Sequence, residues 1–217
     1  MKNDYKYLFF DLDGTLTDSA PGIMNGFRYA IGKMGLEIPE ETILRKFVGP
    51  PLSESFEKGL GLSKEDSTAA IAFYREYYFK DGVFENVVYP GIPELLEKLK
   101  ERGKILAVAT SKLDKPAMMV LDHFGLTDFF TFISTTNDKD ITTKKHVIER
   151  AISSLNITDL SEAVMIGDRF HDISAAKEVG IDSIGVLFGY GDRSELEGAG
   201  ASQIAENTDD IFNITAG

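Results

Sequence analysis

The stretch YKYLFFDLDGTLTDSA, residues 5 to 20, leads an apolar run directly into two carboxylates. The run is short, rich in aromatic residues and flanked by polar ones, which is typical of a strand inside a parallel sheet. Asp11 and Asp13 follow it with one residue between them. Buried carboxylates lose their hydration and neighbouring ones repel each other, so this pair is costly without a cation. We therefore expect positive charge beside Asp11 and Asp13.

Two further apolar runs end in polar residues in the same way. Residues 104–109 (KILAVA) lead into Thr110 and Ser111, and residues 163–166 (AVMI) lead, after one glycine, to Asp168. Helical segments lie between and after these runs, and each ends at a glycine suited to a left-handed C-terminal cap, namely Gly103, Gly125 and Gly180. This alternation of strand and helix predicts a doubly wound α/β fold with a parallel sheet.

Residues 19–88 interrupt the alternation and read as helices only. Helical spacing relates the apolar residues Ile23, Phe27, Ala30, Ile31 and Met34. Further along, Ser63 and Asp66 occupy capping-box positions, and Pro90 followed by glycine marks a return to the core. We therefore predict an all-helical cap domain over residues 19–88, inserted into a catalytic core made of residues 1–18 and 89–217.

Composition and net charge limit the kinds of molecule that this protein can bind and the cellular compartment in which we expect it. The formal net charge is −12 at pH 7, so the surface as a whole repels nucleic acid and anionic lipid. No apolar run is long enough to span a bilayer, and the charged N-terminal stretch is unlike a signal peptide. The absence of cysteine excludes disulfides, thiolate metal sites and cysteine nucleophiles. We expect a cytoplasmic protein, monomeric or homodimeric, with no nucleic-acid or membrane partner and with a small-molecule substrate.

The polar residues after the three runs are expected to meet, because ligands of an open parallel sheet bind outside the carboxyl ends of its strands. These residues are Asp11 and Asp13, Thr110 and Ser111, and Asp168, with Asp172 one helical turn later. Phosphoryl transfer uses such a set, with Asp11 attacking phosphorus to form an aspartyl phosphate. Asp13, on the same face of an extended strand, would protonate the leaving oxygen and then activate water. Gly14 would let the chain turn away, and the Thr15 hydroxyl would steady Asp13.

Mg²⁺ would supply the positive charge that the carboxylates require. It is a hard cation that a few carboxylate oxygens, phosphate oxygens and water can satisfy. We expect its ligands to be Asp11, Asp168 and the main-chain carbonyl of Asp13.

A phosphate group needs a lysine and hydrogen-bond donors as well as the metal. Thr110 and Ser111 can donate hydroxyl and backbone N–H groups at their strand end. The segment TTKKHVIERAISSL, residues 142–155, offers two adjacent lysines. Lys144 lies near the centre of the apolar face of this expected helix, whereas Lys145 lies to one side. We choose Lys144 as the phosphate-binding lysine and keep Lys145 as the alternative.

Four motifs together resemble the haloacid dehalogenase superfamily of phosphotransferases. They are FFDLDGTLTDS (9–19), ATSK (109–112), Lys144 and IGDRFHD (166–172), of which the DxDGT pattern after an apolar strand is the specific signal. The resemblance implies a Rossmann-like core, a helical cap and Mg²⁺-dependent hydrolysis through an aspartyl phosphate. It further implies these roles: Asp11 as nucleophile and metal ligand, Asp13 as acid, base and main-chain ligand, Thr110 and Lys144 as phosphate binders, Asp168 as metal ligand, and Asp172 as a supporting carboxylate or a ligand through water.

Within the superfamily, the chain most resembles phosphoglycolate phosphatase-like proteins. The segments GTLTDS (14–19), FVGPPLSESF (47–56) and MIGDRFHDISAAKEVGI (165–181) carry this resemblance, which implies a small phosphorylated metabolite such as phosphoglycolate as substrate. The cap would select the leaving group, and Arg45 and Lys46 are the cap cations expected to bind substrate. Ordinary solvated charges at a helix end are the other interpretation of these two residues.

Several alternatives share part of this pattern. A 5′-nucleotidase is the main competitor, because a flexible cap could admit a nucleoside. A sugar phosphomutase related to β-phosphoglucomutase normally presents a histidine soon after the first motif, and residues 14–60 contain none. Asp13 argues against a dehalogenase, which needs no acid/base carboxylate at that position. A phosphoacceptor signalling module would have no use for a large helical insertion. The last alternative is a purely structural role, with Asp11 and Asp13 as satisfied caps at a strand end.

Overall fold

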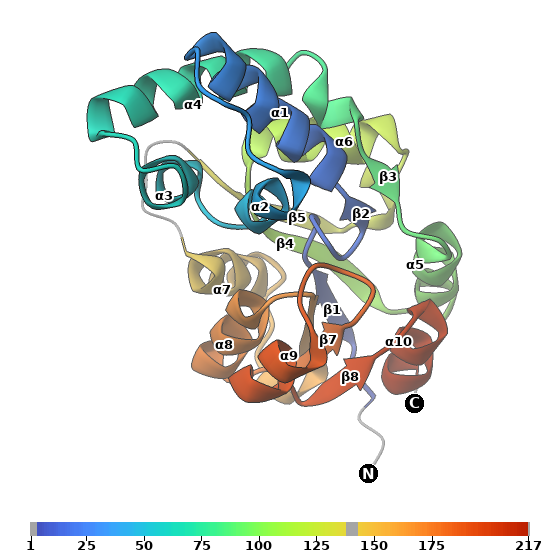
Figure 1. Cartoon of the computed structure of the whole chain (residues 1–217). Coiled ribbons are helices and arrows are strands. Elements are labelled where there is room, and N and C mark those ends of the chain that lie inside the picture. The colour runs from blue at the N-terminus through green and yellow to red at the C-terminus, as the bar shows by residue number, and fades with distance from the viewer. Residues whose placement is uncertain (1–3, 138–142, 217) are drawn as a thin grey trace. The chain divides into compact units, whose positions relative to one another are not determined.

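A parallel sheet of six strands, in the order β5-β4-β1-β6-β7-β8, carries the three apolar runs (Figure 1). The computed structural model describes residues 4–137 and 143–216. The strands are β1 (Tyr7–Phe10), β4 (Ile105–Leu113), β5 (Phe132–Thr136), β6 (Ala163–Gly167), β7 (Asp182–Val186) and β8 (Gln203–Ala205). Phe10 stands opposite Val108 of β4 and Ile166 of β6, so the residues that follow these positions lie at one edge of the sheet.

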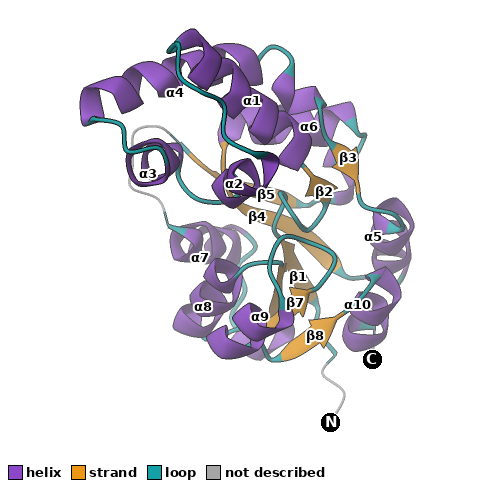
Figure 2. Cartoon of the chain, viewed as in Figure 1, coloured by secondary structure: helices purple, strands orange, loops and turns teal. Residues whose placement is uncertain are grey.

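Helices cover the sheet, as expected for a doubly wound fold (Figure 2). They are α5 (Ile92–Glu101), α6 (Asp114–His123), α7 (Lys144–Ser154), α8 (Phe170–Val179), α9 (Arg193–Ala199) and α10 (Thr208–Thr215), with 3-10 turns at Thr127–Phe129 and Leu160–Glu162. On one face, α7 and α8 bury Val147 and Ala176 against Phe9 and Met165 of the sheet. The helices α5 and α10 pack against each other. The α/β fold class predicted from the sequence is confirmed.

Contacts divide the chain into two compact units. The core unit contains residues 1–18 and 88–217, and the helical unit contains residues 19–87. Two short strands, β2 (Thr17–Asp18) and β3 (Val87–Val88), pair with each other at the points where the chain passes from one unit to the other.

The helical unit contains helices and helical turns between residues 19 and 86. Its elements are α1 (Ala20–Lys33), α2 (Glu41–Leu44), η1 (Arg45–Phe47), α3 (Leu52–Glu54), a π-helical turn (Ser55–Gly59), α4 (Lys64–Tyr78) and a 3-10 turn (Gly82–Phe84). An aromatic cluster holds them together, because the Phe27 ring of α1 lies 5.2 Å from Tyr74 of α4 and 4.8 Å from Phe56. Ser63 caps α4 by accepting the N–H of Asp66, as its capping-box position predicts.

Within residues 4–137 and 143–216, no helix combines the length and the apolar character needed to span a membrane.

Candidate active site

Three carboxylates gather at the carboxyl ends of β1 and β6. Asp11 directly follows β1, Asp168 directly follows β6, and Asp172 lies in the first turn of α8. One oxygen from each of the three lies within 4.8 Å of the other two. Asp168 and Asp172 are fully buried and the Asp11 side chain is 13% exposed. We call these three residues the carboxylate cluster.

Lys144 brings positive charge to this cluster. Its Nζ lies 2.8 Å from Oδ1 of Asp11 and 2.8 Å from Oδ1 of Asp172, and it donates to the carbonyl of Ala109. Lys144 is the first residue of α7, and the preceding Thr143 caps that helix by accepting a backbone N–H in its first turn. The chain therefore places the lysine at a helix start, facing the ends of β1 and β4. Lys145 instead pairs with Glu149 on the surface, so Lys144 is the lysine of this pair that reaches the carboxylate cluster, and its contact with phosphate stays a prediction.

Burial and charge both act on the cluster. Burial raises the pKa of Asp11 to about 6, with Lys144 opposing the rise and Asp172 adding to it. Burial, followed by repulsion from Asp172 and Asp11, also raises the pKa of Asp168 well above its ordinary value. Burial acts to lower the pKa of Lys144, but Asp11 and Asp172 raise it above its ordinary value. One ammonium thus faces three carboxylates, and a divalent cation with hard oxygen ligands fits this donor set.

Asp13 lies beside the cluster and has a lysine of its own. The Nζ of Lys112 lies 3.0 Å from Oδ1 and 2.9 Å from Oδ2 of Asp13. The Lys112 side chain is 7% exposed and that of Asp13 is 24% exposed. The sequence reasoning assigned no role to Lys112, although a lysine directly after two hydroxyl residues at a strand end is a recognisable signal.

Thr15 does not occupy the place expected from the sequence. Its hydroxyl lies 3.5 Å from Oδ1 of Asp168, and the prediction that it steadies Asp13 is wrong. The reason is the tight turn after β1, in which the N–H groups of Thr15 and Leu16 both point to the carbonyl of Leu12. Gly14 makes this turn with φ of 84°, and a Cβ there would lie 2.2 Å from Oδ2 of Asp168. Gly14 therefore provides both the left-handed turn and the close approach of Asp168.

Thr110 and Ser111 lie near the end of β4, where its pairing with β5 shifts register between Ala109 and Leu113. Thr110 is buried, and its Oγ1 accepts the backbone N–H of Lys112. The Ser111 carbonyl accepts the hydroxyl of Thr136 on β5. Both residues lie at the edge of the sheet expected for a phosphate site, and their contact with phosphate stays a prediction.

The loop after β7 contacts Asp168 and was missed by the sequence reasoning. The Tyr190 N–H donates to Oδ2 of Asp168 over 2.8 Å, and the Tyr190 hydroxyl donates to Asp18. A Cβ at Gly189 would lie 2.3 Å from the carbonyl oxygen of Gly14, so only glycine fits at this position. The Gly-Tyr-Gly sequence, which two residues separate from the end of β7, was the available signal. This loop fixes one oxygen of a carboxylate in the cluster.

Arg45 and Lys46 belong to the helical unit, in η1. Arg45 is exposed and its Nε lies 3.7 Å from Oε1 of Glu41, one turn earlier. Lys46 is exposed as well. Their part in substrate binding stays a prediction.

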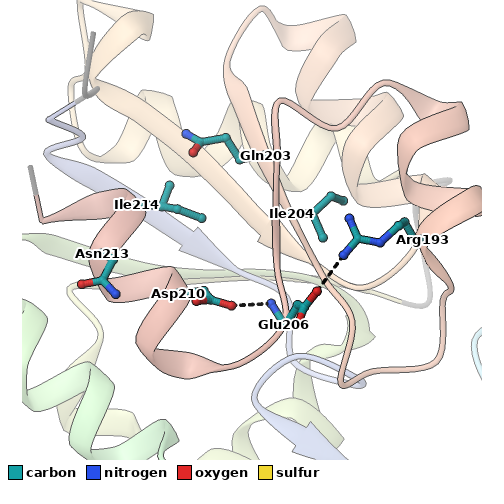
Figure 3. A pocket seen from close by; sticks show the side chains of 7 residues that line it. All are labelled: Arg193, Gln203, Ile204, Glu206, Asp210, Asn213 and Ile214. Carbon is teal, nitrogen blue, oxygen red and sulfur yellow. Dashed lines mark hydrogen bonds and ion pairs between the residues drawn. The ribbon is translucent and has the colours of Figure 1, made fainter.

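A surface pocket of about 440 Å³ lies elsewhere on the core unit (Figure 3). Its lining residues are Arg193, Gln203, Ile204, Glu206, Asp210, Asn213 and Ile214. Three of its polar residues contact one another, since Arg193 pairs with Glu206 and the Glu206 N–H donates to Asp210. The pocket shares no residue with the carboxylate cluster, and we assign it no function.

Comparison with known proteins identifies the family. The family model described as haloacid dehalogenase-like hydrolase matches residues 8–186. A 5′-nucleotidase of Pseudomonas aeruginosa is 38% identical over 193 residues, which are 88% of this chain and 87% of that protein. The tyrosine-protein kinase PtkA of Mycobacterium tuberculosis is 41% identical over 186 residues, 85% of this chain, and the match spans 62% of PtkA.

A solved structure agrees with these sequence matches. The crystal structure of a predicted phosphatase from Clostridium acetobutylicum has a TM-score of 0.89 and 43% sequence identity, covering 96% of this chain and 97% of that one. The motifs quoted from the sequence lie within the matched residues 8–186. The chain therefore belongs to the haloacid dehalogenase-like hydrolases and is a phosphatase.

Proposed function

We propose that this phosphatase is a Mg²⁺-dependent phosphomonoesterase that forms an aspartyl phosphate on Asp11. The observation that carries the proposal is the carboxylate cluster, with Lys144 in contact with Asp11 and Asp172 and with Asp13 beside it. A nucleophile, an acid/base carboxylate, a lysine and hard oxygen ligands are the parts that two-step phosphate ester hydrolysis requires.

In the first step, an oxygen of Asp11 attacks phosphorus while the bond from phosphorus to the ester oxygen breaks. Asp13 gives its proton to the leaving oxygen, so that an alcohol departs and Asp13 becomes a carboxylate. In the second step, Asp13 takes a proton from a water molecule whose oxygen attacks phosphorus. The bond between phosphorus and Asp11 breaks, which restores the Asp11 carboxylate and yields inorganic phosphate, while Asp13 keeps the proton that it took from water.

Lys144 supports both steps by charge. Its Nζ contacts Asp11 directly, so it favours the ionised carboxylate that attacks phosphorus. The same ammonium is placed to attract a phosphate group bound at Asp11, and Thr110 would add a hydroxyl donor from the end of β4.

The described residues fit Mg²⁺. Asp11 and Asp168 would hold it, together with the Asp13 main-chain carbonyl and with Asp172 directly or through water. When bound, the ion supplies positive charge that stabilises the phosphate oxygens during transfer. Asp172 also accepts the backbone N–H of Arg169 and contacts Lys144, so two partners fix its carboxylate within the cluster.

For the substrate, we propose a small phosphorylated metabolite. The motif resemblance in residues 47–56 and 165–181 favours a phosphoglycolate-like compound. The 38% identity to a 5′-nucleotidase favours a nucleoside monophosphate as the second candidate. We propose that the helical unit acts as the cap, with Arg45 and Lys46 contributing to the choice of leaving group.

The test is phosphate release with and without Mg²⁺ from phosphoglycolate, nucleoside monophosphates and sugar phosphates. We expect Mg²⁺-dependent release by the wild type and none by Asp11→Asn, which keeps the size of the side chain and which we expect to fold as the wild type does. Turnover by Asp11→Asn at the wild-type rate would refute the mechanism. An unchanged substrate ranking in Arg45→Ala and Lys46→Ala would remove these two residues from substrate selection.

A further inference from the structure

Lys112 is the buried cation at this sheet edge that the proposed mechanism does not use. Its single ammonium contacts both oxygens of Asp13, at 3.0 and 2.9 Å. The lysine is the more deeply buried partner, with 7% of its side chain exposed against 24% for Asp13. An ion pair between two exposed, mobile side chains contributes little to stability or to their placement. A buried lysine, in contrast, has lost most of its conformational freedom on making this contact.

The local backbone explains why Lys112 points at Asp13. Pairing between β4 and β5 shifts register between Ala109 and Leu113, and a bulge of this kind redirects the side chains within it. Two hydrogen bonds fix the redirected segment, one from the Lys112 N–H to Oγ1 of Thr110 and one from the Thr136 hydroxyl to the Ser111 carbonyl. The end of β4 is therefore held in a conformation in which the Lys112 side chain points to Asp13.

The two lysines serve different carboxylates. Lys144 contacts Asp11 and Asp172, while Lys112 contacts Asp13. A carboxylate that transfers a proton must keep an oxygen within hydrogen-bond reach of the reacting atoms in both steps. Asp13 belongs to no regular strand, since it forms only an isolated bridge with Thr17, and it is partly exposed, so a fixed partner limits its rotation.

We infer that Lys112 is a positioning residue, which holds the Asp13 carboxylate in place for proton transfer. This inference rests on the proposed function, because it takes the acid/base role of Asp13 from it. The competing role is direct binding of substrate by the Lys112 ammonium. The two roles differ in whether Lys112 matters once Asp13 can no longer transfer protons.

A double-mutant cycle between Lys112→Met and Asp13→Asn separates these roles. The assay is steady-state hydrolysis of the alkyl phosphate that the wild type cleaves fastest in the panel above. We expect Lys112→Met to lower kcat about tenfold or more, a part of the contribution of general acid/base catalysis, and to leave KM nearly unchanged. In the Asp13→Asn background, Lys112→Met should have no further effect, because the residue through which it acts is already lost.

Two further variants complete the design. Lys112→Arg should recover part of kcat, since a guanidinium can also hold a carboxylate through two contacts, and it keeps the charge if Lys112→Met folds poorly. Lys115→Met, an exposed lysine three residues further along, is the matched control and should behave as wild type.

The possible failures are distinct. Equal losses from Lys112→Met in the wild-type and Asp13→Asn backgrounds would overturn the inference, and so would a rise in KM at constant kcat, which indicates substrate binding. If Lys112→Met had the kcat and KM of the wild type while Asp13→Asn had a lowered kcat, the inference would also be overturned, but the proposed function would stand. Full activity of Asp13→Asn would overturn the proposed acid/base role itself.

Discussion

Replacing Lys144 by methionine is the most informative change to the stability of the core unit. Methionine keeps most of the length and the apolar stem but removes the ammonium, which lies 2.8 Å from both Asp11 and Asp172. Three carboxylates would then face one another without a cation. We expect the metal-free variant to be markedly less stable than the wild type, and we expect Mg²⁺ to recover part of the loss.

The size of the effect follows from the geometry. With an effective dielectric constant of about 20, two unit charges 2.8 Å apart attract each other by about 6 kcal/mol, and Lys144 makes two such contacts. Dehydration of the buried lysine cancels much of this gain, so the net loss is smaller than the gross attraction. Removal of one partner from a buried ion pair costs about 3 to 5 kcal/mol, which we take as the expected loss for Lys144→Met.

The stability difference between wild type and Lys144→Met should also depend on pH, and the direction of that dependence can be tested. The attraction requires ionised carboxylates, and the pKa of Asp11 is raised by burial to about 6, so this contribution is lost as the pH falls through about 6. The raised pKa of Lys144 keeps the ammonium charged throughout neutral and moderately alkaline solution. The difference in stability between wild type and Lys144→Met should therefore be large at neutral pH and should shrink in acid.

The assay is urea unfolding of the metal-free protein, with Lys145→Met as the matched control. Lys145 makes an exposed contact of 3.8 Å with Glu149, and losing it should cost at most about 1 kcal/mol. If Lys144→Met were as stable as Lys145→Met at neutral pH, the argument that Lys144 compensates the buried carboxylates would be refuted.

Two other predictions concern the same edge of the sheet. Gly189→Ala should cost about 1 to 3 kcal/mol through overpacking against Gly14 and should lower kcat by displacing the donor to Asp168. Unfolding and kinetics would be compared with Gly198→Ala, where no described residue lies within 4 Å of the added Cβ, and wild-type behaviour of Gly189→Ala would disprove the loop's role. The pKa of Asp11 is raised from 3.8 to about 6, so the metal-free fold loses stability as pH rises through this window. Because protons and Mg²⁺ compete for that carboxylate, the Mg²⁺-induced rise in Tm should grow from about pH 5 to about pH 7, and an equal rise at both values would contradict this.

Topology explains how much of the site could be predicted from the sequence. Parallel strands present their carboxyl ends at one edge of the sheet, and this rule predicted that Asp11 and Asp168 lie close together. In the structure, a carboxylate oxygen of one lies within 4.8 Å of a carboxylate oxygen of the other. Helical periodicity distinguished Lys144 from its neighbour, because a lysine on an apolar face must reach a charge inside the protein. Both inferences depended only on regular geometry, which a sequence pattern encodes well.

The missed contacts depend on irregular backbone. Lys112 reaches Asp13 through a register shift that no alternation of side chains predicts. Thr15 turns toward Asp168 because residues 12–16 form a tight turn rather than an extension of the strand. Tyr190 acts through its backbone N–H, and the identity of a side chain carries no information about such a donor. Bulges, turns and main-chain donors are set by tertiary contacts, so the sequence alone did not reveal them.

Charge balance links these residues to the order of events in the proposed reaction. Among the described residues named above, four carboxyl groups and two lysines lie at this edge, so the site carries two negative charges in excess once all four carboxyl groups are ionised, on a chain whose net charge is already −12. A phosphate monoester carries nearly two negative charges at neutral pH, so it would be repelled from the site as the protein alone presents it. A divalent cation cancels the excess, and we therefore expect substrate affinity, and not only the rate of the chemical step, to depend on Mg²⁺.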